Sequence, residues 1–393
     1  MRNATSAASA NSVFTFRVTL KDAKGRTLSG SFAVSGADET SVANGGTLTL
    51  HGNGSFTIEG LPHGAQYELT ETNLPDGWTM TGSVNTTGTI SANETAEASF
   101  ENTYSTGGSV QLTAKKHFIG GEIEPEQFAF TLLESEGTEL SRVYAEKRDD
   151  DASWGTIEFP VIGYTQADDG ATYEYVIRET VGEETDVIYD TTEHRVRVRV
   201  RDNGFGGLIT EVEYLDEADA EDGVIFTNRQ RVDMTISKTI GGTLGDLTKK
   251  FDFTVRYFTV DEDGAETPYT EAITAPEGCD WTAVADAPGV YAFKLGHEQS
   301  ITVAGLPCGV SYEVVEARVG DYVTTVTVDG GEAVESDTAA GVIMKATTVA
   351  YRNTLDGTVD TGIADAAPML YSAGAGVIAL GAYLALKLRR KDD

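Results

Sequence analysis

Short runs in which apolar and polar residues alternate recur along the whole chain. Residues 14–20, 110–118 and 232–240 each place mainly apolar side chains at every second position. Because successive side chains of a β-strand point to opposite faces, this period of two predicts half-buried strands. Glycine-containing turns separate the runs, and amphipathic helical patterns are hard to find. The pattern therefore predicts several all-β domains.

One strand motif places a carboxylate among its apolar side chains. Residues 60–71 read GLPHGAQYELTE and residues 305–316 read GLPCGVSYEVVE, with a looser version, GATYEYVIRE, at 170–179. The alternation puts Glu71, Glu179 and Glu316 on the same faces as the apolar residues before them. An ionisable group on a core face is costly unless it is paired or neutralised, so each of these glutamates should have a partner.

The repeats divide the chain into three β-units and a tail. We place the units at residues 1–104, 109–229 and 230–355, with a small Ser/Thr/Gly linker at 105–108 and the tail at 356–393. The first and third units are internal repeats, because FTFRVTL corresponds to FDFTVRYF and both contain the GLP motif. The second unit has related landmarks with different internal lengths. A chain of 393 residues is long enough for about two to four domains.

Composition excludes several functions. Sixty-two acidic residues against 29 basic ones give a formal charge of −33, which argues against nucleic acid or anionic lipid as the main partner. The five histidines form no metal or haem motif, and no convergent catalytic set is visible, so we expect no metal, no cofactor and no enzyme. Cys279 and Cys308 are the only cysteines, and they could form one disulfide or remain two free thiols.

The second and third units place the same three polar residue types on inward faces, in the same order. A lysine lies on the first strand, a glutamate on a middle strand and an asparagine on the last strand. A sandwich in which the first and last strands are neighbours would bring the lysine next to the asparagine. The two sets are Lys116, Glu179 and Asn228, and Lys238, Glu316 and Asn353.

These residue types support a one-time covalent reaction. Burial lowers the pKa of a lysine and raises that of a glutamate, and a neutral lysine is a nucleophile. A protonated glutamate can donate a hydrogen bond to the asparagine carbonyl and polarise it. Attack of Nζ on Cγ then releases ammonia and leaves an isopeptide bond, and proximity removes the need for an external enzyme. Glu179 and Glu316 would act as proton shuttles. The alternative is a buried Lys–Glu ion pair with an asparagine at the strand end.

The first unit lacks one member of the set. Glu71 and Asn102 are present, but no lysine precedes Phe14, and Lys21 and Lys24 fall at or beyond the end of the first strand. Either this unit has no cross-link, or the sequence begins inside the domain and its first strand is missing. Residues 1–11 contain no apolar stretch typical of a signal peptide, which favours the second interpretation.

The tail has the composition of a membrane anchor. Residues 366–388 are nearly all apolar or small, close to the roughly 20 residues that cross a bilayer. A basic cluster overlaps and follows this stretch, which places the extreme C-terminus in the cytoplasm. The cluster consists of Lys387, Arg389, Arg390 and Lys391.

In these motifs the chain resembles the isopeptide-bonded pilin and adhesin-stalk modules of Gram-positive surface proteins. The second unit resembles the Spy0128-like pilin module through AKKHFIGG, FAFTL, YEYVIRE, VIYD and FTN, and the other two resemble Cna-B-like repeats through GLP-G-Y-E and a closing FENTY or YRNTL. The resemblance implies three tandem immunoglobulin-like or transthyretin-like β-sandwiches, followed by a C-terminal transmembrane helix. It also implies the cross-linking roles given above for the lysines, glutamates and asparagines.

The tail also resembles a sortase sorting signal, which has a short motif, an apolar span and a basic end. Thr361 and Gly362 match the last two residues of the usual leucine-proline-any-threonine-glycine motif, whereas the leucine and proline are not matched. The resemblance implies transient contact with sortase and attachment to peptidoglycan. An ordinary C-terminal membrane anchor is the alternative.

From the sequence we expect a cell-surface stalk or pilin-like structural protein, anchored at its C-terminus to the cell wall or membrane. Two alternatives stay open. The chain could be an adhesin that binds a host matrix protein, or a polymerising subunit that joins other pilin subunits. The polymerisation motif of the family, a lysine after tyrosine-proline, is absent from the sequence.

Overall fold

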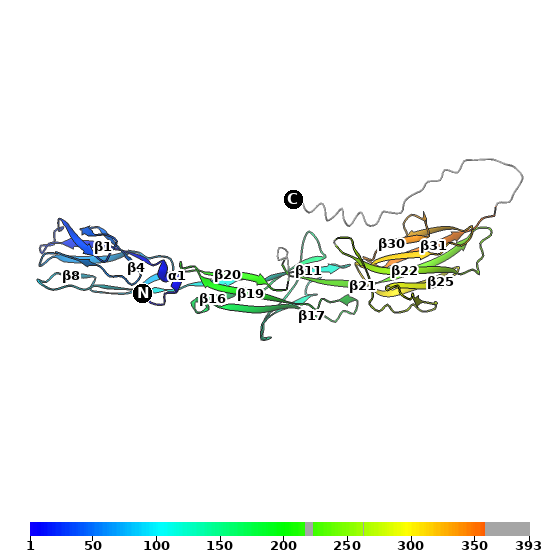
Figure 1. Ribbon diagram of the computed structural model, residues 1–393, viewed down its shortest axis with the longest axis horizontal. Helices are drawn as coiled ribbons and strands as arrows, with labels where there is room; N and C mark the ends of the chain where they lie inside the picture. Colours follow the sequence, from blue (N-terminus) through cyan, green and yellow to red (C-terminus); the bar gives the residue numbers. More distant parts are fainter. Residues whose placement is uncertain (217–222, 262, 358–393) are drawn as a thin grey trace, which may run out of the picture.

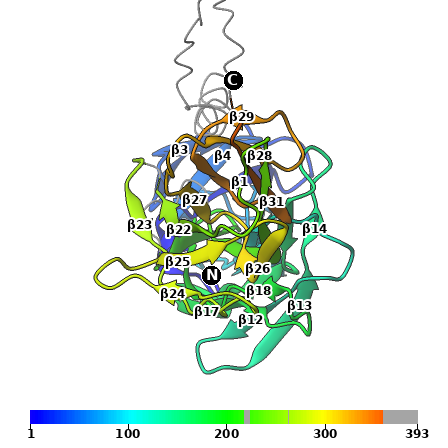
Figure 2. The same ribbon diagram turned by 90° about the vertical axis from the view of Figure 1, so that its right-hand side faces the viewer.

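The chain folds into a row of β-rich bodies. Figure 1 shows them end to end along the long axis, and Figure 2 shows the row from one end. The structure is a computed structural model that describes residues 1–216, 223–261 and 263–357. Nearly all regular structure in these residues is β, which confirms the predicted fold class in its coarse form of several β-domains.

The first unit is built around β1, which pairs with β4 on one side and with β6 on the other. Its inward side chains are buried as the alternation predicted, and they pack under a second layer made of β3, β2 and β5. A short helix, α1, precedes β1, and the Thr5 side chain caps it by accepting a hydrogen bond from Ala8 N at 3.0 Å. The elements are α1 (Ser6–Ala10), β1 (Val13–Lys21), β2 (Ser31–Ser35), β3 (Ser41–Ala43), β4 (Thr47–His51), β5 (Thr57–Ile58), β6 (Gln66–Asn73), β7 (Trp78–Val84), β8 (Thr87–Thr89) and β9 (Ser99–Tyr104).

The second unit packs a five-stranded sheet, in the order β13-β12-β17-β19-β20, against the strands around β11. Inward residues of both layers form one core cluster. Its elements are β10 (Gly107–Val110), β11 (Thr113–Ile119), β12 (Ala129–Glu134), β13 (Glu139–Tyr144), β14 (Glu146–Lys147), β15 (Trp154–Glu158), β16 (Ile162–Thr165), the 3₁₀ helix η1 (Gln166–Asp168), β17 (Thr172–Thr180), β18 (Val187–Ile188), β19 (Glu193–Asp202), β20 (Leu208–Tyr214) and β21 (Ile225–Gly241).

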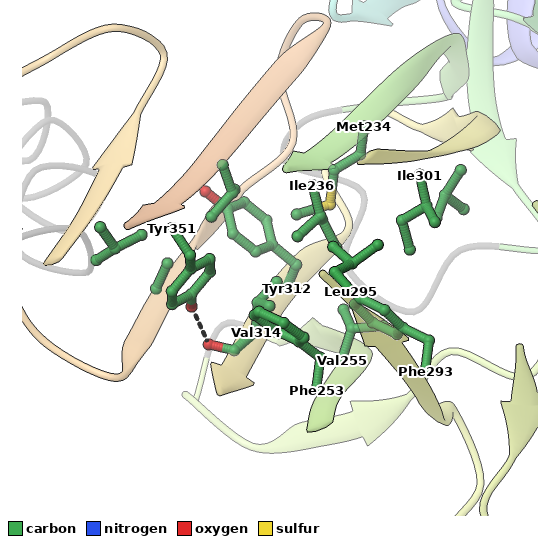
Figure 3. Packing of buried hydrophobic residues seen from close by; sticks show 14 of the residues in the cluster. Met234, Ile236, Phe253, Val255, Phe293, Leu295, Ile301, Tyr312, Val314 and Tyr351 are labelled. Atoms are coloured by element: carbon green, nitrogen blue, oxygen red, sulfur yellow. Dashed lines mark hydrogen bonds between the residues drawn. The ribbon is translucent and has the colours of Figure 1, made fainter. Parts of the chain in front are cut away.

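The third unit repeats this two-layer plan with a sheet in the order β24-β25-β22-β27-β30. Figure 3 shows its core, in which the Tyr351 hydroxyl donates a hydrogen bond to Val314 O at 2.8 Å and so satisfies a buried polar group. The remaining elements are β22 (Phe251–Val260), β23 (Glu266–Pro268), β24 (Thr282–Ala283), β25 (Val290–Leu295), β26 (Gln299–Pro307), β27 (Ser311–Glu316), β28 (Val323–Val328), β29 (Val334–Glu335), β30 (Thr338–Val342) and β31 (Thr347–Thr354).

One long strand joins the second and third units. The border that we place at 229–230 lies inside β21, which runs without interruption for 17 residues. Its first part pairs with β11 of the second unit, and its later part pairs with β31 and β26 of the third. A single nine-stranded sheet therefore passes from one unit into the next.

Hydrogen bonds also tie the first unit to the second. The Tyr104 hydroxyl donates to Asp202 Oδ1 at 2.8 Å and accepts from Gly206 N at 2.8 Å, and Thr5 donates to the other oxygen of Asp202. Gly77 and Gly206 approach so closely that a Cβ on Gly77 would lie 2.6 Å from the Gly206 Cα. Two glycines are needed here because the backbones touch.

The predicted tail features lie outside the described residues. These are the membrane segment at 366–388 and the sorting residues Thr361 and Gly362. Within the described ranges, no helix has the length and apolar character to span a membrane.

Candidate functional site: buried Lys–Glu–Asn triads

Parallel pairing of the first and last strands places a lysine beside an asparagine in the second unit. Strand β11 pairs with β21 so that Lys116 lies opposite Phe226 and Phe118 lies opposite Asn228. The lysine and the asparagine are thus offset by two positions on neighbouring strands. Residues two apart share a face, so both side chains point into the core.

The third unit repeats this register. Strand β21 pairs in parallel with β31, with Lys238 opposite Tyr351 and Ile240 opposite Asn353. The offset of two positions is the same as in the second unit. The same local geometry therefore occurs twice along the chain.

The glutamates come from the opposite layer of each unit. Glu179 lies on β17, opposite Phe130 of β12, and Glu316 lies on β27, opposite Phe253 of β22. The structure thus brings together the two sets of residues found in the sequence. We call Lys116, Glu179 and Asn228 the second-unit triad, and Lys238, Glu316 and Asn353 the third-unit triad.

In the second-unit triad the glutamate contacts both other members. Lys116 Nζ lies 2.7 Å from Glu179 Oε2, and Asn228 Nδ2 donates to Glu179 Oε1 at 2.7 Å. The side chains of Lys116 and Glu179 are 0% exposed. Such burial removes water from the reacting groups and holds them in a fixed arrangement.

The third-unit triad has nearly the same contacts. Lys238 Nζ lies 2.9 Å and 2.8 Å from the two oxygens of Glu316, and Asn353 Nδ2 donates to Glu316 Oε1. All three residues are buried.

Two phenylalanines enclose each lysine ammonium, a feature that the sequence reasoning did not assign to the site. Lys116 Nζ lies 4.8 Å from the Phe128 ring centre and 5.6 Å from that of Phe130. Lys238 Nζ lies 4.4 and 5.9 Å from the rings of its own pair, Phe251 and Phe253. The available signal in the sequence was the F-x-F spacing, FAF at 128–130 and FDF at 251–253, at the start of β12 and of β22.

Burial shifts both members of each ion pair toward their neutral forms. It lowers the pKa of Lys116 and of Lys238 to about 8, although the neighbouring glutamate opposes the shift. It likewise raises the pKa of Glu179 and of Glu316, against the effect of the lysine. A lysine with a pKa of about 8 is partly neutral near pH 7 and is therefore a competent nucleophile.

The asparagine amide is oriented differently from the sequence expectation. We expected the glutamate to donate a hydrogen bond to the asparagine carbonyl. In both triads the amide nitrogen faces the glutamate instead, because a carboxylate that accepts from the lysine offers acceptor oxygens to the amide N–H. In the second unit the carbonyl oxygen Asn228 Oδ1 accepts from the backbone N–H of Asp190 at 2.8 Å.

The first unit contains only part of this arrangement. Asn102 Nδ2 donates to Glu71 Oε1 at 2.7 Å, and burial raises the Glu71 pKa. Arg2 forms a parallel bridge with Thr103 of β9. Residues 1–3 therefore lie beside the last strand of the first unit, as β11 lies beside β21 in the second unit and β21 beside β31 in the third. Among the described residues, no lysine reaches this pair, and Glu71 Oε2 and Asn102 Oδ1 have no hydrogen-bond partner.

The two cysteines are not bonded to each other. Both are free thiols, which is one of the two states that the sequence left open. Cys308 is buried where the second and third units meet, with its backbone N–H donating to Gln230 O at 2.8 Å, whereas Cys279 Sγ contacts Pro276 O. Across the described ranges, no group of histidine, cysteine, aspartate or glutamate side chains could hold a metal ion.

The fold and the triads define an elongated protein of tandem β-domains with a buried lysine, glutamate and asparagine in each of two units. A family described as the Spy0128-like isopeptide containing domain matches residues 112–231. A second family, described as a domain of unknown function (DUF7601), matches residues 3–104 and 232–354, which is more than half of the chain. The chain belongs to the DUF7601 family and carries a Spy0128-like isopeptide containing domain between its two DUF7601 regions.

Known proteins of the pilus share parts of this sequence. The pilus tip adhesin Cpa of Streptococcus pyogenes is 32% identical over 130 residues, which cover 33% of this chain and 18% of the adhesin. A pilin of Streptococcus pyogenes serotype M1 is 28% identical over 248 residues, 58% of this chain and 70% of the pilin. A solved mutant of the major pilin from Streptococcus pyogenes is 21% identical, with a TM-score of 0.30, and the match covers 63% of this chain and 99% of that one.

These matches confirm two expectations from the sequence. One family covers both the first and the third unit, which the shared motifs predicted, and the second unit is of the Spy0128-like type. The chain groups with pilin-like structural proteins and not with an enzyme family. The Cna-B-like character of the first and third units stays a prediction.

Proposed function

We propose that the chain is a cell-surface stalk or pilin-like protein whose second and third units are each locked by an internal Lys–Asn isopeptide bond. The observation that carries this proposal is the repeated triad: two buried sets of the same three residues, in the same parallel register, with the glutamate bridging the other two. A structural ion pair alone would not require an asparagine amide on the same carboxylate in both units.

The reaction follows from the contacts within each triad. In the neutral form of the pair, the Lys116 Nζ lone pair attacks Asn228 Cγ while the proton resides on Glu179. Glu179 gives that proton to Nδ2, the Cγ–Nδ2 bond breaks and ammonia leaves. The carboxylate then takes one proton from the new amide nitrogen, so the glutamate returns to its starting state. Lys238, Glu316 and Asn353 would react in the same way.

The position of the two bonds explains their mechanical value. Strand β21 carries Asn228 of the second-unit triad and Lys238 of the third-unit triad. Tension along the row would enter at Lys116, cross the first bond, follow about ten residues of β21 and leave through the second bond to Asn353. The load would pass through covalent bonds, so the hydrogen-bonded sandwiches on either side would not have to resist it.

Intact-mass measurement of the full chain tests this proposal. Each bond removes one ammonia, about 17 Da, so we expect a loss of about 34 Da for two bonds. Glu179→Ala should restore about 17 Da through the second unit only, and Glu316→Ala should do the same through the third. Glu313→Gln is the matched control, because Glu313 lies on β27 three residues before Glu316, on the opposite face, where it pairs with the partly exposed Arg256. An unshifted mass for the folded wild-type chain would contradict the proposal.

A second function is supported by the match to the pilus tip adhesin. In this case the units would form a stalk that also presents a surface to a host matrix protein. Binding of the full chain to such a protein, measured by surface plasmon resonance, would support it. Polymerisation with other pilin subunits is a further proposal that rests on the match to the pilin. It predicts high-mass covalent ladders in cell-wall extracts.

A further inference from the structure

The asparagine carbonyl has a hydrogen-bond donor in only one of the two complete triads. In the second unit the backbone N–H of Asp190 donates to Asn228 Oδ1 at 2.8 Å. In the third unit Asn353 Oδ1 is buried and has no hydrogen-bond partner among the described residues. The two units share the nucleophile, the proton shuttle and the leaving group, but they differ at the oxygen on which negative charge would develop.

The side chain of Asp190 holds its own N–H in place. Asp190 Oδ2 accepts from Thr227 N at 2.9 Å, and Oδ1 accepts from Thr192 N at 3.0 Å. Thr227 directly precedes Asn228 on β21, so the carboxylate fastens the loop to the strand that carries the reacting amide. Strand β18 pairs with β21 at Ile188 and Arg229, and the chain leaves this ladder just before Asp190.

The charge of Asp190 is maintained by the same contacts. Burial on its own would raise the Asp190 pKa, but the hydrogen bonds from Thr227 and Thr192, together with the nearby charge of Lys116, outweigh it and lower the pKa. The carboxylate is therefore ionised at neutral pH and accepts both N–H groups, and charge-assisted bonds of this kind are stronger than neutral ones.

The third unit pairs its asparagine strand differently. Strand β28 runs antiparallel along β31 with Thr324 opposite Asn353, and the ladder continues past this position. The chain does not turn there to aim a free N–H at the asparagine side chain. The missing donor thus follows from the backbone path of β28.

We propose that the backbone N–H of Asp190, positioned by the Asp190 carboxylate, stabilises the oxyanion that forms on Asn228 during attack by Lys116, so the second-unit bond forms faster than the third-unit bond. The inference rests on the proposed isopeptide chemistry. The N–H is not transferred: it donates to the oxygen while Cγ is tetrahedral and again when the carbonyl re-forms. Donors aimed at developing charge are among the largest contributors to catalysis, and losing one costs about 100- to 1000-fold in rate.

Refolding kinetics can test this with the full chain. Unfolded chain from inclusion bodies, shown by intact mass to be unreacted, is diluted into native buffer and samples are quenched in acid. Peptide mapping then gives separate rates for the Lys116–Asn228 and Lys238–Asn353 cross-links. We expect the second-unit bond to form at least about tenfold faster, a threshold set below the roughly 100- to 1000-fold cost of a lost donor.

Variants of Asp190 separate the two contributions. Asp190→Ala removes both carboxylate bonds and should slow the second-unit reaction at least about tenfold, with the third-unit rate unchanged as the internal control. Asp190→Asn keeps one acceptor oxygen and should recover part of the rate. A chain that retains only Trp154, with Trp78 and Trp281 replaced by phenylalanine, reports folding of the second unit by fluorescence. Its folding rate should not change with Asp190→Ala.

Three outcomes would overturn the inference: equal rates in the two units, an unchanged second-unit rate in Asp190→Ala, or a folding rate that falls as much as the bond-forming rate. The last result would give Asp190 a purely structural role. Failure of the proposed function looks different, because then neither cross-link would appear in the wild-type chain.

Discussion

Mechanical unfolding of a variant that cannot form the third-unit bond gives a sharp test of the load path. Glu316→Gln removes the proton shuttle while keeping the shape of the side chain. Lys238→Met removes the nucleophile and leaves Glu316 without its lysine, and burial, which raises the Glu316 pKa, then favours the protonated acid. If both variants lose the bond, the segment between Lys238 and Asn353 becomes free to extend under force. The wild-type bond would keep this segment out of the load path.

The expected extension follows from the length of that segment. It contains about 115 residues, and a fully extended chain gains at most about 3.6 Å per residue, so its release should lengthen the molecule by roughly 40 nm. The first unit has no lysine beside Glu71 and Asn102, so its roughly 100 residues should unfold in every variant with a step of about 35 nm. This step marks each molecule that has been correctly attached.

Single-molecule force spectroscopy on the full chain, held at its two ends, would count these steps. We expect one step for the wild type, two for either third-unit variant and one for the surface control Glu313→Gln. A wild-type chain that shows steps of roughly 40 nm in addition to the first-unit step would refute the reasoning, because its second and third units would then lack a covalent load path.

Three further predictions concern the second unit and its joint with the first. Lys116→Met should remove the constraint on a loop of about 112 residues, worth roughly 5 kcal/mol in the unfolded state, and lower the melting temperature of this unit by roughly 15–25 °C in calorimetry. Refolding at different pH values should give a rate of Lys116–Asn228 bond formation that is highest near neutral pH. The rate should fall above about pH 8, because Lys116 then loses the proton that it shares with Glu179 and no acid remains to protonate the leaving nitrogen. It should also fall in acid, because the pair then holds two protons and the lysine is no longer neutral. Tyr104→Phe should leave Asp202 without one hydrogen-bond donor, which costs about 1–3 kcal/mol of stability. The unfolding temperature of the first unit should fall by several degrees in calorimetry. An unchanged transition would show that the joint does not depend on this hydrogen bond.

Alternation in the sequence was sufficient to locate the triads. In a strand, the position of a lysine or glutamate within an apolar run decides by itself whether the side chain points inward. The choice of Lys116 over Lys115 follows from parity alone, and the structure buries Lys116 completely while Lys115 is only half-buried. That the first and last strands are neighbours was an assumption from sandwich geometry. It holds in both complete units, where the structure adds that the two strands pair in parallel.

Other features could not be read from the pattern because they depend on tertiary contacts. Strand β21 continues across the expected border between units, and no proline or glycine interrupts residues 225–240. The helix at Ser6–Ala10 is too short to have a periodic signal, and Thr5 and the packing of Ala8 stabilise it. The contact from Asp190 involves a backbone N–H, which exists at almost every residue and so leaves no mark in the sequence.

The most direct measurement of the central claim is tandem mass spectrometry of a tryptic digest of the folded, full-length chain. We predict two branched peptides, one joining Lys116 to Asn228 and one joining Lys238 to Asn353, each lighter than the sum of its parts by about 17 Da. No branched peptide should involve Asn102. Recovery of the four residues only in linear, unmodified peptides would contradict the account.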